Sequence, residues 1–364
     1  MIAIEKILDK AIKEDASDVH LIVGIKPMLR IARNLIEAPD THVLTEEEIY
    51  EVYDYLIRGN IEKDEVYRKT RRLDSSFEYK DIRLRINISY SNEAPVITLR
   101  LIKNTLPKFS DLGVPDIVKR MTSQPQGLIL VTGKTNSGKT TTLNALVNEI
   151  NENENKKILT LENPIEFKHE SKQSVIVQKE VGPGRDALTF SAGVKNALRE
   201  DCDILIIGEI RDKETMDAAI EMAESGHLVI GTLHTKSCAE TIDRMINFYE
   251  IGDQTTVKYL ISSLLKLVIS QRLIKSTDEK LIMLPEVMVV DNIIAGCIRK
   301  EKFSVSELED AMQSNIDKGN ISLTHSISKL FVDDKITLER AKSQIEEKNY
   351  ETLNRTIMQM KIQK

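Results

Sequence analysis

A glycine-rich segment between an apolar run and a stretch of helical periodicity carries the strongest chemical signal in this sequence. Residues 127–150 read GLILVTGKTNSGKTTTLNALVNEI, in which Gly133, Gly138, Lys139 and Thr140 satisfy the pattern G-x-x-x-x-G-K-[ST]. In such a loop the backbone N–H groups and the start of the following helix bind phosphate oxygens. We expect Lys139 to neutralise the β- and γ-phosphates of a nucleotide and the Thr140 hydroxyl to reach Mg²⁺.

The remaining positions of this loop are expected to contact the nucleotide as well. They are Thr135, Asn136, Ser137 and Thr141. Asparagine is the residue that, after glycine, best tolerates a left-handed backbone, so Asn136 is compatible with a tight loop. The segment NKKI at 155–158 lacks the aspartate of a guanine-recognising Asn-Lys-x-Asp motif, which favours ATP over GTP.

Carboxylates follow two other apolar runs. Glu209 comes after the run DILII (203–207), with Gly208 at the position where a magnesium-binding acid is expected. Glu209 could hold hydrated Mg²⁺ or orient water, or it could be a surface acid paired with Arg211. In TLENPIEF (160–167), either Glu162 or Glu166 could act as the general base for an attacking water.

Two histidines and one basic cluster remain as candidates. His227 and His234 flank the run at 228–233, and a metal site is disfavoured because further ligands are missing. His227 could have a functional role or be a buried histidine whose hydrogen bonds are satisfied, and the two interpretations are about equally supported. His20 is expected to be structural. The cluster RKTRR (68–72) could bind phosphate or an acidic partner, but such runs are usually solvated turns.

The elements that position these residues are expected in the second part of the chain. Apolar runs of strand length at 127–131, 157–161, 203–207 and 227–233 alternate with helical segments such as 214–226. Continuous apolar strands between helices predict a parallel sheet covered on both faces, whose carboxyl edge holds the ligand. From about residue 256 onward we predict helices.

The first part of the chain is predicted to be a small α+β domain. A helix is expected over 3–14, and another over 45–57 with Thr45 as N-cap and Glu48 completing a capping box. Short β-type runs lie at 19–23, 27–31, 75–79, 82–89 and 94–102. The predicted organisation is a domain at 1–104, a linker at 105–112 and a domain at 113–364.

Composition limits the class of protein. The chain has 364 residues, 41% of them hydrophobic and 30% charged, which is typical of globular proteins. The net charge of −6 disfavours nucleic acid as a partner, and the three cysteines lie too far apart for a zinc or disulfide framework. No apolar stretch is long enough for a membrane span, and the acidic N-terminus does not resemble a signal peptide. We therefore expect a cytoplasmic protein.

The chain resembles the secretion ATPases of type II and type IV pilus systems, and among them the retraction enzymes. Four motifs carry the resemblance in order: GKTNSGKTT, TLENPIEF, ILIIGEIRD and ESGHLVIGTLHT. Three further segments extend the resemblance over nearly the whole chain: ASDVHL (16–21), RLRIN (83–87) and SLLKLVISQRLIK. The first two match the family's N-terminal domain, and the third matches its C-terminal helices. The resemblance implies a PAS-like N-terminal domain, a RecA-like P-loop ATPase domain and a homo-hexamer that binds ATP between subunits.

The resemblance also implies roles for individual residues. It makes His234 a sensor of the γ-phosphate and assigns the catalytic water to the acidic box without deciding between Glu162 and Glu166. Arginines that reach the neighbouring subunit's nucleotide would be Arg83, Arg85, Arg100 and Arg199. Two positions depart from the family pattern: Asn163 replaces an aspartate, and Lys195 replaces an arginine. Lysine lacks the bidentate fork of arginine.

The expected function is ATP-driven pilus retraction through an inner-membrane platform protein, with pilin contacted only indirectly. The chain would lie at the cytoplasmic face of the membrane. The stretch IIAGCIRK (293–300) keeps only part of a motif of retraction enzymes, so pilus assembly or type II secretion stays an alternative. A regulator that hardly hydrolyses ATP is a second alternative, and a nucleic-acid motor is a third.

Overall fold

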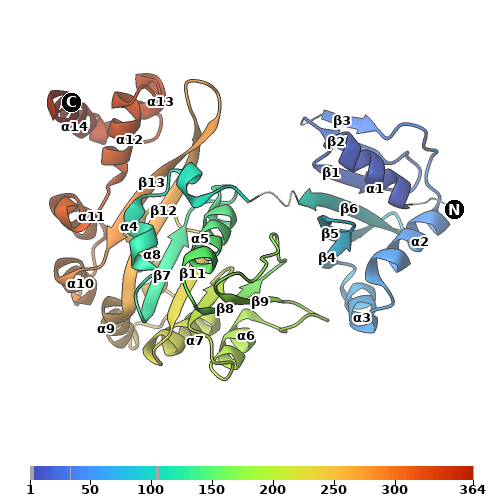
Figure 1. Cartoon of the computed structure of the whole chain (residues 1–364), viewed down its shortest axis with the longest axis horizontal. Coiled ribbons are helices and arrows are strands. Elements are labelled where there is room, and N and C mark those ends of the chain that lie inside the picture. The colour runs from blue at the N-terminus through green and yellow to red at the C-terminus, as the bar shows by residue number, and fades with distance from the viewer. Residues whose placement is uncertain (1–3, 33, 103–105, 364) are drawn as a thin grey trace. The chain divides into compact units, whose positions relative to one another are not determined.

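The computed structural model describes residues 4–32, 34–102 and 106–363, and contacts divide them into two units (Figure 1). The first unit comprises the described residues up to 102 together with Glu162–Lys168 and Gln178–Thr189. The second comprises Leu106–Leu161, His169–Val177 and the described residues from Phe190 onward. Two segments that lie between strands of the second unit in sequence therefore make their contacts with the first.

The first unit is built on a six-stranded antiparallel sheet with the order β3-β2-β1-β6-β5-β4. Its strands are β1 (Asp18–Leu21), β2 (Met28–Ile31), β3 (Asn34–Glu37), β4 (Leu73–Tyr79), β5 (Ile82–Ser91) and β6 (Ala94–Ile102). Its helices are α1 (Ile4–Lys13), α2 (Glu46–Ile57) and α3 (Ile61–Thr70). The predicted α+β character and the Thr45–Glu48 capping box are confirmed.

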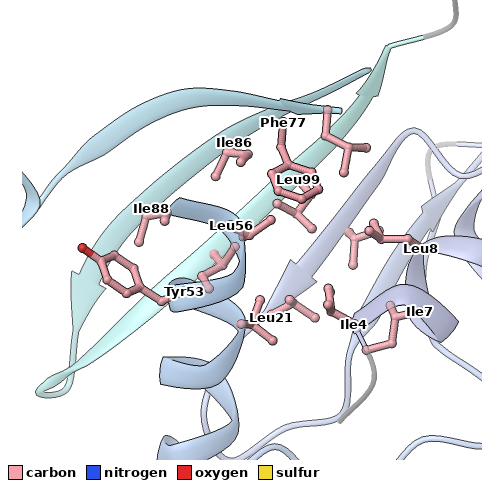
Figure 2. Close-up of a cluster of buried hydrophobic side chains, with 14 of the residues drawn as sticks. Ile4, Ile7, Leu8, Leu21, Tyr53, Leu56, Phe77, Ile86, Ile88 and Leu99 are labelled. Carbon is pink, nitrogen blue, oxygen red and sulfur yellow. The ribbon is translucent and has the colours of Figure 1, made fainter. Parts of the chain in front are cut away.

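Alternation along the strands separates the two faces of this sheet. On β5, Leu84, Ile86 and Ile88 are buried while Arg85 is exposed on the other face. Figure 2 shows the buried side converging with residues of α1 and α2, including Leu8, Tyr53 and Leu56. The charged face is therefore left for polar contacts.

The second unit contains a seven-stranded sheet with the order β13-β12-β7-β11-β10-β8-β9. Its strands are β7 (Gly127–Thr132), β8 (Lys157–Glu162), β9 (Val175–Glu180), β10 (Ile204–Ile207), β11 (Leu228–Leu233), β12 (Leu265–Lys275) and β13 (Leu281–Val289). The strands β12, β7, β11, β10 and β8 run parallel, and all residues of β7, β10 and β11 are buried. The parallel sheet predicted from continuous apolar runs is confirmed.

Helices connect and flank these strands (Figure 1). They are α4 (Asp116–Met121), α5 (Lys139–Asn153), α6 (Phe190–Ala197), α7 (Lys213–Glu224), α8 (Cys238–Ile246), α9 (Gln254–Leu264), α10 (Asn292–Arg299), α11 (Val305–Ser314), α12 (Leu323–Val332), α13 (Leu338–Lys342) and α14 (Tyr350–Gln363). Short 3-10 turns occupy Phe109–Leu112, Ile316–Lys318 and Glu347–Asn349. In the described part of the chain, no helix has the length and apolar character that crossing a bilayer requires.

The prediction of helices from about residue 256 onward is wrong for the segment 265–289. After α9 the chain forms the β12–β13 hairpin, and β12 extends the parallel sheet beside β7. The segment KLVISQRLIK was therefore assigned to helices incorrectly. Its apolar stretch at 267–269 is too short for periodicity to separate a helix from a strand, and only the pairing of this segment with β7 decides between them.

Among the helices after the hairpin, α12 packs on β13 and on α14, whereas α10 contacts α9 and α11 contacts α8 (Figure 1). A separate apolar cluster joins Ile274 and Leu284 of the hairpin to side chains of α12, α13 and α14. The members from those helices and the residues between them are Ile327, Ile336, Ala341, Leu353 and Ile357. The C-terminal region is thereby fixed to the same strand, β12, that borders the phosphate-loop strand.

Candidate active site

The strand order of the second unit brings three predicted motifs to one edge of the sheet. β7, β11 and β10 are direct neighbours, with Thr132 opposite Leu233 and Ile207 opposite Gly231. The phosphate loop, His234 and Glu209 follow the carboxyl ends of these strands. Parallel strands end at the same edge, which is where ligands bind in such folds.

The phosphate loop has the backbone that its glycines require. Gly133 has φ +149°, and a Cβ atom there would lie 2.4 Å from the carbonyl oxygen of Gln271, so no larger residue fits. Gly138 has φ +85° directly before α5. Asn136 has φ +63°, which confirms the left-handed backbone expected there.

The Lys139 ammonium group is held by the loop itself. Its Nζ donates to the carbonyl oxygens of Gly133 at 2.8 Å and Lys134 at 3.0 Å, and lies 3.4 Å from Nδ1 of His234. Burial lowers the pKa of Lys139, and the charge of Glu209 partly offsets this. A lysine with three donors and only neutral acceptors around it is ready to exchange them for a phosphate anion.

His234 joins this lysine to the carboxylate that follows β10. Its Nε2 lies 3.0 Å from Oε1 of Glu209, and the other carboxylate oxygen of Glu209 accepts from Arg211 at 2.5 Å. Burial and the nearby Lys139 charge lower the pKa of His234, so the imidazole is neutral at pH 7. Its proton then lies on Nε2, donated to Glu209, while Nδ1 accepts from Lys139. The three side chains form one hydrogen-bonded line.

Gln271 is a residue of this site that the sequence analysis missed. It lies on β12, is fully buried, and its Nε2 donates to the carbonyl oxygen of Ser137 in the phosphate loop at 2.7 Å. Among the described residues, its Oε1 has no partner, and neither have the buried hydroxyls of Ser137 and Thr142. If the stretch LVIS (267–270) had been assigned to a strand, a glutamine directly after it would have indicated a polar group at the end of that strand.

A cavity of about 910 Å³ opens beside the phosphate loop within the second unit. Gly138, Thr141 and Gln271 line the part of this cavity at the loop. Leu112, Leu273 and Met283 give it an apolar wall, and polar side chains such as Ser276 and Asp278 lie on the hairpin. An apolar cleft with a few polar groups is what a nucleotide base and ribose require.

The residues present fit a magnesium nucleotide. The loop is too narrow for a side chain at Gly133 and leads into a helix of 15 residues. The buried hydroxyl of Ser137 in the loop has no partner among the residues that the structure describes. Thr140 stands in the first turn of α5 and Glu209 supplies carboxylate oxygens, the donors that Mg²⁺ prefers.

The two acids of the predicted acidic box lie in the first unit. Glu162 is the last residue of β8 and is buried, and its Oε1 accepts from Nε2 of Gln178 at 3.0 Å. Glu166 is half-buried, and burial raises its pKa although Arg85 and Arg100 lower it. Their environments differ, and either can still accept a proton from water.

The four arginines predicted as fingers have different surroundings. Arg83 makes an ion pair with the buried Glu180 and donates to Ser76 at 3.0 Å. Arg100 pairs with Asp18 at 2.9 Å, while Arg85 and Arg199 are exposed. Arg83 is thus tied down within its own chain, whereas Arg85 presents its charge to solvent.

The other basic and histidine candidates have structural contacts. In the cluster RKTRR, Arg68 pairs with Asp64, Arg72 pairs with Asp74, and Arg71 stacks on Tyr90. His227 lies 2.9 Å from the hydroxyl of Ser225 at the end of α7. His20 lies 3.3 Å from the hydroxyl of Thr98.

His169 links the segment after the acidic box to the phosphate-loop helix. Its Nε2 donates to Oδ1 of Asn144 at 2.7 Å, and Nδ2 of Asn144 donates to the carbonyl oxygen of Thr140 at 2.9 Å. Burial lowers the pKa of His169 from 6.5 to about 4. The neutral imidazole therefore helps to hold the turn that carries Thr140.

Acid is expected to destabilise the protein through His169. Because its folded pKa lies below its unfolded pKa, the unfolded state binds more protons as the pH falls below about 6.5. We expect the free energy of unfolding of wild type, relative to His169→Gln, to fall by about 2 kcal/mol between pH 7 and pH 5. Chemical denaturation at both pH values measures this. The control His42→Gln alters an exposed imidazole, and an equal effect there would contradict the assignment.

Comparison with known proteins places this geometry in context. A family model described as type II/IV secretion system protein matches residues 1–363. The type IV pilus retraction ATPase PilT of Pseudomonas aeruginosa is 37% identical over 343 residues, which cover 93% of this chain and 97% of that protein. The type II secretion system protein E of Aeromonas hydrophila is 33% identical over 282 residues, covering 75% of this chain and 54% of that protein.

A solved structure agrees with the sequence relatives. The crystal structure of the pilus retraction motor PilT with bound ADP matches with a TM-score of 0.87 and 32% identity, covering 96% of this chain and 99% of that one. The predicted fold class, a RecA-like P-loop domain with a smaller α+β domain, is thereby confirmed.

Proposed function

Because this chain belongs to the type II/IV secretion system protein family, we propose that it is a magnesium-dependent ATPase motor that drives type IV pilus retraction. One observation carries the proposal: the line from Lys139 through His234 to Glu209 lies at the phosphate loop, beside which a cavity of about 910 Å³ opens. The near full-length similarity to PilT supports the direction of the motor.

In the proposed reaction, phosphate oxygens replace the loop's own carbonyls around Lys139. The ammonium group then turns away from the Nδ1 atom of His234, which it contacts at 3.4 Å here. His234 keeps its bond to Glu209, so the imidazole reports whether the lysine is engaged. His234 could sense the γ-phosphate in this way, because its Nδ1 atom and the phosphate would compete for the same donor, the ammonium group of Lys139.

Thr140 and Glu209 are the residues proposed to hold Mg²⁺, Thr140 directly and Glu209 through water. The metal would supply charge neutralisation to the phosphates. Glu209 is oriented for this by His234 on one carboxylate oxygen and Arg211 on the other. The attacking water is assigned to Glu162 or Glu166, and comparing Glu162→Gln with Glu166→Gln would identify the base.

We propose a homo-hexamer in which arginines of one subunit complete the site of its neighbour. Arg85 is chosen for the test because it is exposed and, unlike Arg83, is not paired with the buried Glu180; Arg199 is exposed as well. Positive charge near the γ-phosphate stabilises the transition state of phosphoryl transfer.

Mixing two inactive variants is expected to restore activity if the arginine acts between subunits. Lys139→Ala and Arg85→Ala should each hydrolyse ATP very slowly. In a randomly mixed ring, roughly one interface in four joins an intact Lys139 to a neighbour's intact Arg85, so roughly a quarter of wild-type turnover should return. Phosphate release after subunit exchange measures it. No recovery in rings shown by mass to be mixed would mean that Arg85 acts in its own subunit.

The proposed partner is the inner-membrane platform protein of the pilus, and pilin subunits are moved only through it. The proposed place of work is therefore the cytoplasmic face of that membrane. Deleting the gene should give hyperpiliated cells that do not twitch. Cells without pili would instead identify an assembly motor.

Pilus assembly or type II secretion is the second candidate function. The relative from Aeromonas hydrophila favours it, as does the incomplete retraction motif at 293–300. A regulator with little hydrolysis is favoured only by Asn163 and Lys195. Purified protein that releases no phosphate in the presence of Mg²⁺ would establish the regulator instead of the motor.

A further inference from the structure

A second, smaller cavity lies wholly within the first unit, and its walls are rich in cations. It has a volume of about 220 Å³ and is bordered by α2, α3, β4, β5 and the segment that follows β9. The residues that line it are Leu56, Ile57, Arg58, Lys63, Ser76, Phe77, Glu78, Arg83 and Arg185. Four of these nine side chains carry a positive charge.

One carboxylate, Glu180, neutralises part of this charge. It is 4% exposed, accepts from the Ser76 hydroxyl at 2.7 Å, and forms ion pairs with Arg83 and with Arg185, the latter at 3.0 Å. Arg185 also donates to the hydroxyl of Ser75. The two arginines thus share a single buried counter-charge.

Lys63 is left without such a partner. Its residue is 8% exposed, and within the described ranges its ammonium group has no hydrogen bond and no ion pair. Burial and the positive charges of Arg185 and Arg58 lower its pKa, and the charge of Glu180, which does not contact it, offsets only part of this. The Nε atom of Arg83 is likewise buried without a partner in the part of the chain that the structure describes. Buried cations and donors of this kind are costly unless an anion compensates them.

The remaining charges do not compensate Lys63. Arg58 stacks on the Phe77 ring at 4.3 Å and donates to the backbone carbonyl of Glu78 at 3.3 Å. The Glu78 carboxylate pairs with Lys168. Four cationic side chains therefore face two carboxylates, and one of those carboxylates has its own partner.

We propose that this cavity binds a phosphate dianion, either free phosphate or the terminal group of a small phosphomonoester. Arginine forks and a lysine ammonium are the side chains that bind phosphate oxygens best. The site differs from the phosphate loop, since its donors are side chains of the first unit instead of backbone N–H groups.

Binding there would reach the acidic box through the backbone. A phosphate that draws Arg83 or Arg185 competes with Glu180 for them. Glu180 precedes Val181, whose N–H donates to the carbonyl oxygen of Glu162 at 2.7 Å. Occupancy of the cavity would therefore act on the strand end that carries Glu162.

Phosphate titrations in a Lys139→Ala background test the proposal. That substitution removes the main phosphate ligand of the loop, so calorimetry with full-length protein should report the second site. Adding Lys63→Met, which keeps an apolar stem and removes the charge, should weaken phosphate binding about tenfold or more. Lys69→Met is the matched control, because Lys69 lies on the same helix α3 but is exposed outside the cavity.

Stability separates a binding role from a structural one. If Lys63 serves to bind an anion, Lys63→Met should unfold at the same temperature as wild type, or at a higher one, when phosphate is absent. Adding phosphate should then no longer raise the unfolding temperature of this variant. Arg58→Gln, at an exposed position, gives a second variant that should weaken binding. Because it also removes the stacking on Phe77, its unfolding temperature without phosphate is measured beside that of wild type. Titration with glycerol 3-phosphate beside inorganic phosphate identifies the source by the tighter ligand. Failure of Lys139→Ala to bind either compound, or equal binding with and without Lys63, would overturn the proposal.

Discussion

Replacing Lys139 with alanine is expected to lower kcat/KM for ATP by at least about 10²–10³-fold, the loss in rate that follows the removal of one preorganised hydrogen-bond donor from an active site. Lys139 supplies the only cationic side chain that the phosphate-loop pattern places at the β- and γ-phosphates. Its loss also frees the carbonyl oxygens of Gly133 and Lys134, which it now holds at 2.8 and 3.0 Å. Magnesium-dependent phosphate release by purified protein measures the effect.

Lys134→Ala is the matched control for this experiment. Lys134 lies in the same loop with an exposed side chain, and only its backbone carbonyl contacts Lys139. It should retain turnover within about threefold of wild type, as expected for a surface charge. Full activity of Lys139→Ala would exclude the phosphate loop as the hydrolytic site, and with it the motor proposal.

Replacing Glu209 with glutamine should reduce kcat by about 10²–10³-fold while leaving nucleotide binding nearly unchanged. The amide has the same shape but carries no charge, and it cannot accept on both oxygens from His234 and Arg211 as the carboxylate does at 3.0 and 2.5 Å. The magnesium concentration for half-maximal turnover should also rise. Turnover against Mg²⁺ concentration, together with binding of a fluorescent nucleotide, measures both effects.

Arg211→Gln distinguishes this role from a surface ion pair. The Arg211 side chain is 72% exposed and contacts the same carboxylate. If Glu209 served only to pair with Arg211, both substitutions would have the same small effect, since exposed pairs contribute about 0–1 kcal/mol. We expect Arg211→Gln to retain turnover within about threefold, and an equal loss in the two variants would refute a catalytic Glu209.

Strand positions in the second unit could be predicted because each depends on local sequence. The runs at 127–131 and 203–207 are apolar on both faces, which a strand covered on both sides requires, and both form strands within one or two residues of their predicted ends. The left-handed Asn136 was likewise predictable, because the conformation depends on the residue type itself.

The hairpin β12–β13 could not be predicted in the same way. The apolar stretch around Val268 and Ile269 covers only 267–269, which is too short for periodicity to separate a helix from a strand. The interaction that decides is the pairing of β12 with β7, where Ser270 lies opposite Thr132 although they are far apart in sequence. Because this strand was not predicted, Gln271 was not predicted either, although its side chain donates to the carbonyl oxygen of Ser137 in the phosphate loop.

The arginines show the same division at the level of side chains. Their alternation on β5 puts Arg83 and Arg85 on one face of the sheet. The sequence did not indicate that Glu180, about 100 positions later, would pair with Arg83 and leave Arg85 exposed. That pairing joins the end of β9 to β5, two strands that are far apart in the sequence.

By itself the sequence determined the phosphate loop, the family motifs and the fold class, because these depend on residue type at fixed spacing. Only the tertiary structure decided that β7, the strand before the phosphate loop, pairs with β11 and not with β8, which is the next strand in sequence. That order sets His234 between Lys139 and Glu209 and turns two separate acidic and basic motifs into one hydrogen-bonded line. Strand order is a property of long-range pairing and burial, for which neighbouring residues carry no signal.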